Sequence, residues 1–158
     1  MSVADFGSGS GAYSIALAEI VGESGKVYAV EIQKDLLTRL QAEAEQKNIT
    51  NIEFVWGDID DVDGSNMRDN SVDRLVVANT LFQVEDRDNC IAEARRVLRP
   101  GGKLLLVDWV ESFGGLGPTP DLVISPDVAR TMFDDAQFEF DRDIIVGDHH
   151  YGMVFKLK

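Results

Sequence analysis

The sequence predicts an α/β fold in which helices cover both faces of a mostly parallel β-sheet. Short β-branched runs alternate with longer stretches whose apolar residues recur at helical spacing, and this alternation is typical of βαβ units. The nearly continuous apolarity of some strand runs indicates strands buried on both faces. The chain has 158 residues, 44% of them hydrophobic, which suits one domain over residues 1–158 whose core needs no disulfide.

Five segments of the first 109 residues have strand character because β-branched and apolar residues are concentrated in them. They are Ser2–Phe6, Lys26–Glu31, Asn51–Trp56, Ser71–Ala78 and Gly102–Trp109. The segments between them carry apolar residues at helical intervals, with a plausible helix stop at Gly22 after the first. The predicted helices are Gly11–Val21, Lys34–Lys47 and Asp86–Leu98.

The last third of the chain departs from this alternation. Ser125 is a candidate N-cap for a helix over residues 126–136, because a proline follows it at the first helical position. Two β-rich runs, Phe138–Val146 and His150–Lys158, then flank the turn Gly147–His149. This is a hairpin pattern. It predicts one antiparallel strand at or near the C-terminal edge of the sheet.

Composition excludes several functional classes. Fifteen basic and 28 acidic residues give a net charge of −13, which repels phosphate backbones and anionic lipid and argues against nucleic-acid and membrane partners. The lone Cys90 excludes a disulfide framework and a multi-cysteine metal site, so no metal is expected, and it fits a reducing compartment. No apolar run approaches the roughly 20 residues of a membrane span. Because Met1 leads directly into the first strand, we expect no signal peptide and a cytoplasmic protein.

The sharpest motif is the glycine-rich run from Asp5 to Gly11 (DFGSGSG) between the first strand and the first helix. Glycines allow a tight turn and let backbone N–H groups approach a ligand, and the helix N-terminus adds partial positive charge. Glu31 ends the second strand, where a carboxylate accepts hydrogen bonds from ribose hydroxyls. This order of elements predicts a nucleoside-containing cofactor across the edge of the sheet.

The glycine motif alone does not distinguish between cofactors, because Gly7–Ala12 also satisfies the looser dinucleotide fingerprint. Other features favour a cofactor with a cationic group. Asp5 is unfavourable beside a pyrophosphate and favourable beside an amino or sulfonium group. Asp58, after the third strand, could accept from an adenine amino group. The chain also leaves little room for a second nucleotide-binding half.

These motifs together resemble a class I S-adenosylmethionine-dependent methyltransferase of the ubiquinone/menaquinone-type, methyltransferase-11-like branch. The resemblance runs from Val3 to Lys158 and is carried by Asp5–Gly11, Gly57–Ile59, Arg99–Lys103 and His150–Phe155. It implies a Rossmann-like three-layer α/β/α sandwich with a seven-stranded sheet of order 3-2-1-4-5-7-6, strand 7 antiparallel. It also implies S-adenosyl-L-methionine as the cofactor.

The resemblance further implies contacts between single residues and the cofactor. Gly7, Ser8 and Gly9 would line its methionyl part, and Asp5 would orient its amino group. Glu31 would hold the ribose diol. The remaining implied contacts are those of Ile32 and Ile59 packing near the adenine, Asp58 meeting its amine, and Asn79 approaching the methionyl group.

Methyl transfer from a sulfonium is an in-line displacement that depends mainly on proximity and alignment. A base is needed only where the acceptor carries a proton. His149, His150 and Asp108 are the candidate catalytic residues, because a strand end and the tip of the hairpin place them at the edge where the ligand is expected. The two histidines equally suit exposed turn residues, and Trp109 suits either packing or shaping the acceptor pocket.

The leading functional hypothesis is methyl transfer to a small-molecule acceptor through carbon, oxygen or nitrogen. The absence of several cysteines argues against arsenite as that acceptor. Related enzymes usually carry covering helices before the first strand, whereas Met1 here lies close to Asp5. We therefore expect a second copy in a homodimer, a lid-supplying partner or the loop Glu111–Ile124 to cover the cofactor. The alternatives are a catalytically incomplete binding module and a small nucleotide-binding oxidoreductase.

Overall fold

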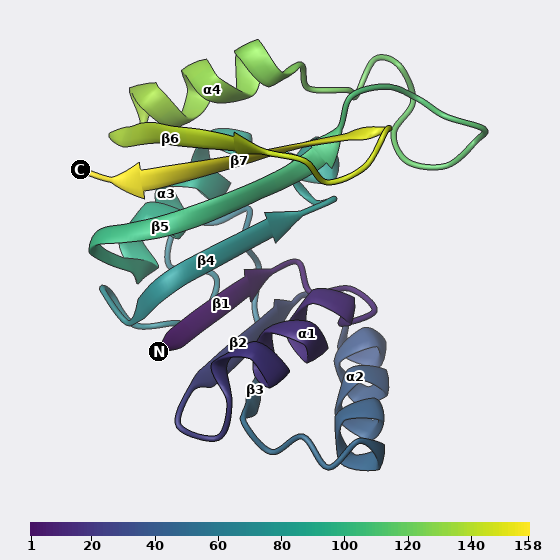
Figure 1. Cartoon of the computed structure of the whole chain (residues 1–158), viewed down its shortest axis with the longest axis vertical. Helices are drawn as coiled ribbons and strands as arrows, with labels where there is room; N and C mark the ends of the chain where they lie inside the picture. Colours follow the sequence, from purple (N-terminus) through teal and green to yellow (C-terminus); the bar gives the residue numbers. More distant parts are fainter.

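The computed structural model describes all residues from Met1 to Lys158 and contains one seven-stranded sheet of order β3-β2-β1-β4-β5-β7-β6. Strands β1 to β5 are mutually parallel, and β7 runs antiparallel to both β5 and β6. The predicted strand order and the antiparallel last strand are therefore confirmed (Figure 1). The strands are β1 Ser2–Phe6, β2 Lys26–Glu31, β3 Ile52–Trp56, β4 Val72–Ala78, β5 Leu98–Trp109, β6 Phe138–Ile144 and β7 His150–Leu157.

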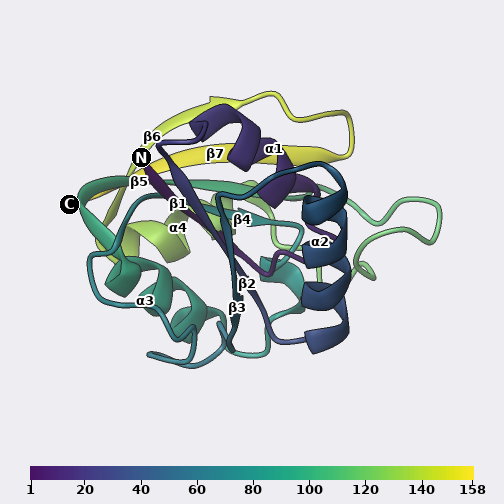
Figure 2. The ribbon, with the colours of Figure 1, turned by 90° about the horizontal axis from the view of Figure 1, so that it is seen from below.

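The helices form the two outer layers. They are α1 Ala12–Val21, α2 Lys34–Gln46, α3 Arg87–Val97 and α4 Pro126–Asp135, with a short 3-10 helix η1 at Leu81–Gln83. Figure 2 shows α1 and α2 on one side of the sheet and α3 and α4 on the other. The larger apolar core lies under α3 and α4, where Phe133 stacks on Phe155 at 4.5 Å between ring centroids. A smaller cluster, which includes Ile15 and Leu40, lies under α1 and α2.

Helix ends agree closely with the sequence signals. The Ser125 hydroxyl accepts from the Val128 N–H at 3.3 Å and caps α4, as expected for a serine before Pro126. The Asp86 carboxylate caps α3 in the same way, accepting from Asn89 N at 2.9 Å. Capping satisfies backbone donors that the first helical turn leaves without partners.

The strand boundary that differs most from the prediction is the start of β5. β5 begins at Leu98 and not at Gly102, because Leu98 already pairs with Val72 of β4. The register then shifts before the next pair, Arg74 with Lys103, so the expected turn is an irregularity inside the strand. Gly101 has a positive φ of 74° within it, a conformation that glycine adopts without steric cost. The last strand pair is also shorter than expected, since β6 ends at Ile144.

The strand order creates a switch point between β1 and β4. The chain leaves β1 toward α1 on one face and leaves β4 toward α3 on the other. Ligands in open α/β sheets bind outside the carboxyl ends of strands at such a point. The topology therefore places the glycine loop and the segment after β4 side by side at one edge of the sheet.

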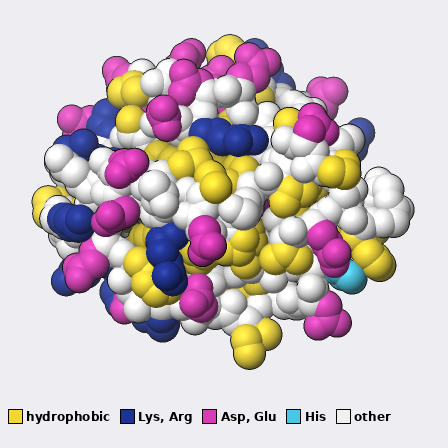
Figure 3. Space-filling model, turned by 90° about the horizontal axis from the view of Figure 1, so that it is seen from above, with side chains coloured by type: hydrophobic (Ala, Val, Ile, Leu, Met, Phe, Trp, Pro, Cys, Tyr) yellow, Lys and Arg dark blue, Asp and Glu magenta, His cyan; other side chains and the backbone are white.

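One face of the molecule carries acidic and basic groups interspersed with one another. Figure 3 shows acidic side chains over the face seen from above, with lysines and arginines as separate groups among them and no continuous basic patch on that face. None of the helices combines the length and the apolarity that crossing a membrane requires.

Candidate cofactor cleft and acceptor rim

A cleft of about 550 Å³ lies at the carboxyl ends of β1 to β4. Three segments make most of its wall: residues 31–33 at the end of β2, residues 57–61 after β3, and residues 83–86 after β4. Gly7 and Thr80 lie at the switch point between them. The cleft thus occupies the position at which the strand order predicts a ligand.

Backbone geometry explains the glycine loop. Gly7, Gly9 and Gly11 all have positive φ, and the Gly7 and Ser8 N–H groups both donate to Val30 O, at 2.9 and 3.0 Å. A Cβ on Gly7 would lie 2.6 Å from the Thr80 side chain. Only glycine therefore allows the loop to approach the segment after β4 this closely.

Glu31 joins the glycine loop to the end of β2. Its Oε2 accepts from Gly9 N at 2.9 Å and its Oε1 accepts from Gln33 N at 3.1 Å. The residue is 7% exposed and lines the cleft. Each carboxylate oxygen keeps a further lone pair for a ligand donor, so the arrangement suits the paired hydroxyls of a ribose.

The acids of the cleft give it a strongly negative character. Six of its lining residues are carboxylic acids and none is lysine or arginine; the acids are Glu31, Asp58, Asp60, Asp61, Glu85 and Asp86. Asp58 Oδ1 accepts from Asp60 N at 2.9 Å, and Asp60 Oδ2 accepts from Glu85 N at 3.0 Å. This second bond ties the wall after β3 to the wall after β4. A lining of one charge sign favours ligands of the opposite sign.

Asp5 lies beneath the glycine loop and does not line the cleft. Its Oδ2 accepts from the Ser14 hydroxyl at 2.6 Å, and the residue is 2% exposed. Burial raises the pKa of Asp5 to about 6, although the Ser14 hydrogen bonds lower it in part. The carboxylate therefore links β1 to the first turn of α1 at an electrostatic cost.

This cost predicts a pH-dependent difference between the wild type and Asp5→Asn. A raised carboxyl pKa contributes stability that is present below the unfolded value and is lost as the pH rises through about 6. One pKa unit corresponds to about 1.4 kcal/mol. As the pH rises from about 4 to about 7, the free energy of unfolding of Asp5→Asn minus that of the wild type should therefore increase by about 2–3 kcal/mol. Urea titrations across this range measure the difference. Parallel curves for the two proteins would contradict the expectation.

The other residues expected to contact the cofactor lie around this cleft. Ile32 and Ile59 line it, with Ile32 52% exposed and Ile59 buried. Ser8 and Asn79 lie outside the lining, and each has a buried side-chain oxygen without a hydrogen-bond partner. Asn79 has a φ of 53° and donates its N–H to Val107 O at 2.9 Å, so it turns the chain sharply as β4 ends.

The structure separates the candidate catalytic residues onto opposite faces of the sheet. Asp108 pairs with Tyr151, and Trp109 pairs with His150, and adjacent strand positions face opposite sides. Tyr151 belongs to the core under α3 and α4, so Asp108 faces that core.

The two oxygens of Asp108 are engaged by backbone donors. Oδ1 accepts from Trp109 N at 2.9 Å and Oδ2 accepts from Phe82 N at 3.2 Å. Burial raises the pKa of Asp108 to about 6, and these two bonds lower it in part. Asp108 therefore fastens the segment after β4 to the end of β5.

Both histidines lie at the rim with aromatic neighbours. The ring of His149 stacks on Phe113 at 3.7 Å, and its Nδ1 lies 2.8 Å from Glu111 Oε1. The ring of His150 packs on Trp109 at 4.1 Å, and its Nε2 is buried without a partner. Partial burial and the neighbouring His149 lower the pKa of His150. The loop after β5 and the hairpin turn thus meet at one aromatic rim.

Reasoning from the sequence missed the cleft wall after β4. Thr80, the segment 83–86 and Asn89 all line the cleft, although their sequence contains no nucleotide-binding motif. The one available signal was topological, because the strand next to β1 across a switch point contributes the opposing wall. Applying it requires the strand order, which the family resemblance implied but local sequence patterns do not contain.

Comparison with known proteins matches this architecture to one family. A family model described as a methyltransferase domain matches residues 1–137. An arsenite methyltransferase of Aquipseudomonas alcaligenes is 36% identical over 111 residues, which are 67% of this chain and 32% of the relative. A ubiquinone/menaquinone biosynthesis C-methyltransferase of Shewanella piezotolerans is 33% identical over 110 residues, 69% of this chain and 43% of the relative. The chain therefore spans less than half the length of these curated relatives.

Solved structures agree with the fold. A SAM-dependent methyltransferase from Aquifex aeolicus superposes with a TM-score of 0.90 at 27% identity, over 100% of this chain and 82% of that structure. A cyclase superposes with a TM-score of 0.84 at 15% identity, over 99% of this chain and 74% of that structure. A shared fold at such low identity does not determine the reaction. The family model over residues 1–137 does establish the family: the chain belongs to the class I methyltransferase domains, whose cofactor is S-adenosyl-L-methionine.

Proposed function

We propose that this chain binds S-adenosyl-L-methionine in the cleft at the ends of β1 to β4 and transfers its methyl group to a small organic acceptor at the aromatic rim. The observation that carries the proposal is Glu31, whose buried carboxylate holds the glycine loop and lines the cleft. Its free lone pairs would accept from the ribose hydroxyls. Ile32 and Ile59 would flank the adenine, and Asp58 would accept from its amine.

Charge supports this cofactor over a dinucleotide. A pyrophosphate would place two negative charges among the six carboxylates of the cleft, with no lysine or arginine to offset them. A sulfonium and an amino group are positive and are favoured by the same surroundings. Asp5 and the orphan oxygens of Ser8 and Asn79 lie on the side of the glycine loop and the end of β4, where we place the methionyl group.

The cofactor supplies a methyl group already activated by the positive sulfur, so this chain has to position the acceptor and remove a proton only where the acceptor carries one. We assign that second task to His150. The lowered pKa of His150 favours its neutral ring, and no hydrogen-bond partner competes for a proton at its Nε2. His149, held by Glu111, would order the rim, and Asp108 would hold the exit of β4 in place.

The rim favours an organic acceptor. Trp109 packs on His150 and Phe113 stacks on His149, and Phe113 remains 46% exposed to a ligand. Arsenite, the substrate in the name of one relative, is disfavoured because Cys90 stands alone and is buried. Burial raises the pKa of the Cys90 thiol to about 12, which keeps it from acting as a thiolate ligand.

A second reading is a binding module whose site is completed by another chain. The observation in its favour is the exposure of apolar groups beside the nucleoside end of the cleft, where Ile32 is 52% and Trp56 is 54% exposed. A second copy or a lid-supplying partner would cover them. A methyl-transfer assay with candidate acceptors separates the two readings, because a module alone would bind the cofactor without turnover.

Replacing Glu31 with alanine tests the proposed site. We expect the Kd for S-adenosylhomocysteine to rise about 10- to 100-fold, since hydrogen bonds to a charged group contribute about 1.5–3 kcal/mol. Calorimetric titration measures this Kd, with NAD titrated in parallel. Glu53→Ala is the matched control, because Glu53 is an exposed strand carboxylate paired with Lys26 away from the cleft. An unchanged Kd in folded Glu31→Ala would remove the basis of the proposal.

A further inference from the structure

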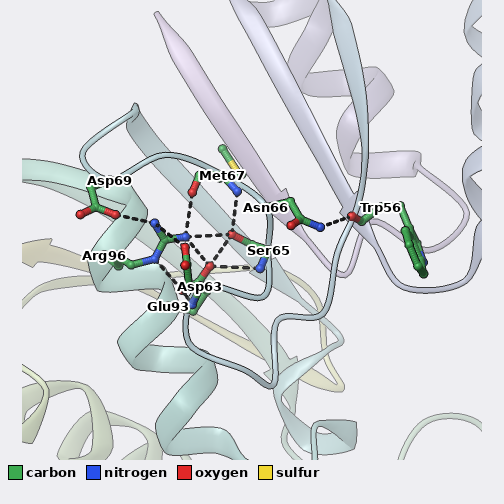
Figure 4. Close-up of polar contacts among 8 residues, drawn as sticks. All are labelled: Trp56, Asp63, Ser65, Asn66, Met67, Asp69, Glu93 and Arg96. Atoms are coloured by element: carbon green, nitrogen blue, oxygen red, sulfur yellow. Dashed lines mark hydrogen bonds and ion pairs between the residues drawn. The ribbon is translucent and has the colours of Figure 1, made fainter.

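The wall of the cleft after β3 belongs to a long irregular segment, the β3–β4 loop, residues 57–71. Its first five residues line the cleft, yet the loop contains no helix or strand of its own. Loops of this length without regular structure need other contacts to hold one conformation. Figure 4 shows that Glu93 and Arg96, two residues of α3 that do not line the cleft, supply several of these contacts.

Glu93 is fully buried and receives donors from the loop backbone. Its Oε2 accepts from Asp63 N at 2.6 Å, and its Oε1 accepts from Ser65 N at 3.1 Å and from the Ser65 hydroxyl. These bonds fix both sides of residue 64. Charge-assisted bonds of this kind are stronger than those between neutral groups.

Arg96 pairs with the buried Glu93 and makes further bonds along the loop. It donates to Glu93 from Nε at 2.8 Å and from Nη2 at 2.7 Å, and Nη2 also donates to Met67 O at 2.8 Å. Its Nη1 pairs with Asp69 and with Asp63. The hydrogen bonds from Arg96, Ser65 and Asp63 hold the pKa of Glu93 below its usual value despite its burial.

The clamped part of the loop rests directly on the cleft wall. A Cβ on Gly57 would lie 2.6 Å from Ser65 O, so the two backbones are in close contact there. The Asp58 N–H donates to Gly64 O at 2.8 Å. A shift of residues 63–65 would therefore move Gly57 and Asp58, the two residues that begin the adenine side of the proposed site.

We propose that Glu93 and Arg96 are positioning residues for the nucleoside half of the cofactor, acting through residues 63–65 on Gly57 and Asp58. The inference rests on the proposed function, because it assumes that the cofactor occupies this cleft. Stability alone does not require the pair, since well-packed apolar residues often stabilise a buried site as well or better. The ion pair differs from apolar packing in that its hydrogen bonds have fixed directions. They therefore select one arrangement of the N–H and C=O groups of the loop.

The test compares Glu93→Gln and Arg96→Lys with the wild type, using two probes at a temperature where all are folded. The probes are S-adenosylhomocysteine and 5′-methylthioadenosine, which lacks the amino-acid part. We expect the Kd of each probe to rise about tenfold and by the same factor, because only the nucleoside side is displaced. Leu157→Ala is the control: it removes core contacts at the opposite edge of the sheet, so it should lower Tm and leave both Kd values unchanged.

The outcomes are distinguishable. If Glu31→Ala weakens binding while Glu93→Gln and Arg96→Lys bind both probes with the wild-type Kd, the positioning role is wrong and the proposed site stands. If Leu157→Ala weakens binding as much as they do, their effect is general destabilisation and the inference is again wrong. If the wild type binds neither probe, the proposed function and this inference both fall. Should Glu93→Gln not fold, Arg96→Lys decides alone, since it keeps the charge beside Glu93.

Discussion

Replacing Arg96 with alanine is expected to lower the free energy of unfolding by about 3–5 kcal/mol, the cost of removing one partner from a buried ion pair. Glu93 would keep its three donors from Asp63 and Ser65 but would lose both bonds from the guanidinium. Met67 O would also lose its donor. Urea denaturation at pH 7 measures the loss, with the m-value showing whether the transition remains two-state.

Two comparisons identify the cause of this loss. Arg96→Ala leaves an unpaired buried charge, so adding Glu93→Gln should recover part of the stability, a coupling that a double-mutant cycle measures. Lowering the pH should also narrow the difference in stability between Arg96→Ala and the wild type. The lowered pKa of Glu93 means that its ion pair stabilises the fold above the unfolded pKa and is lost as the pH falls through the folded one. A loss independent of pH and of Glu93 would contradict the ion-pair explanation.

Gly11→Ala is expected to destabilise the protein by about 2–5 kcal/mol, the sum of two costs. Gly11 has a φ of 86°, and a side chain in the left-handed region costs about 1–2 kcal/mol. An added Cβ would also lie 2.1 Å from Cδ1 of Leu40, a fully buried residue of α2. Overpacking of this kind costs about 1–3 kcal/mol. Thermal and urea unfolding measure the total loss in the free energy of unfolding.

Matched variants separate the two costs. Gly101→Ala places a Cβ at a similar φ of 74°, where the nearest atom is the flexible Lys156 Cε at 4.0 Å, so it should show the backbone cost alone. Leu40→Ala removes the clash partner. It is destabilising by itself, by about 2–5 kcal/mol, but in its presence the further loss from Gly11→Ala should shrink to that of Gly101→Ala. If Gly11→Ala lowers the free energy of unfolding equally in the wild type and in Leu40→Ala, the clash is relieved by other movements.

Local patterns were enough to predict the strands, the helices and one half of the site, while the order of the strands was implied by the family resemblance. Apolar periodicity located the helices, and Ser125 with Pro126 located the start of α4 within one residue. The glycines after β1 stand where a tight turn restricts the residue type, and the acid at the end of β2 stands where the expected ligand does so. The structure places Gly7 and Glu31 in one cleft, as the motif predicts.

The contributions of α3 could not be predicted in the same way. Glu93 and Arg96 stand three residues apart on a helix, a spacing that usually describes an exposed surface pair. Their burial depends on the β3–β4 loop folding over them, which is a contact between segments about 30 residues apart in the chain. The early start of β5 has a similar origin, because it depends on the pairing of Leu98 with Val72 and not on the residues of the turn.

The sequence by itself determined the secondary structure and the residue types at the strand ends, because these follow from short-range sterics, periodicity and capping. Only the tertiary structure decided which of these ends face one another. It placed Asp108 toward the core and His150 toward the rim, although Asp108 near the end of β5 and His150 at the start of β7 lie at the same edge of the sheet. It also brought the segment after β4 into the wall of the cleft. The physical reason is that strand order and side-chain facing depend on pairing between distant segments, whose free energy no local window of sequence contains.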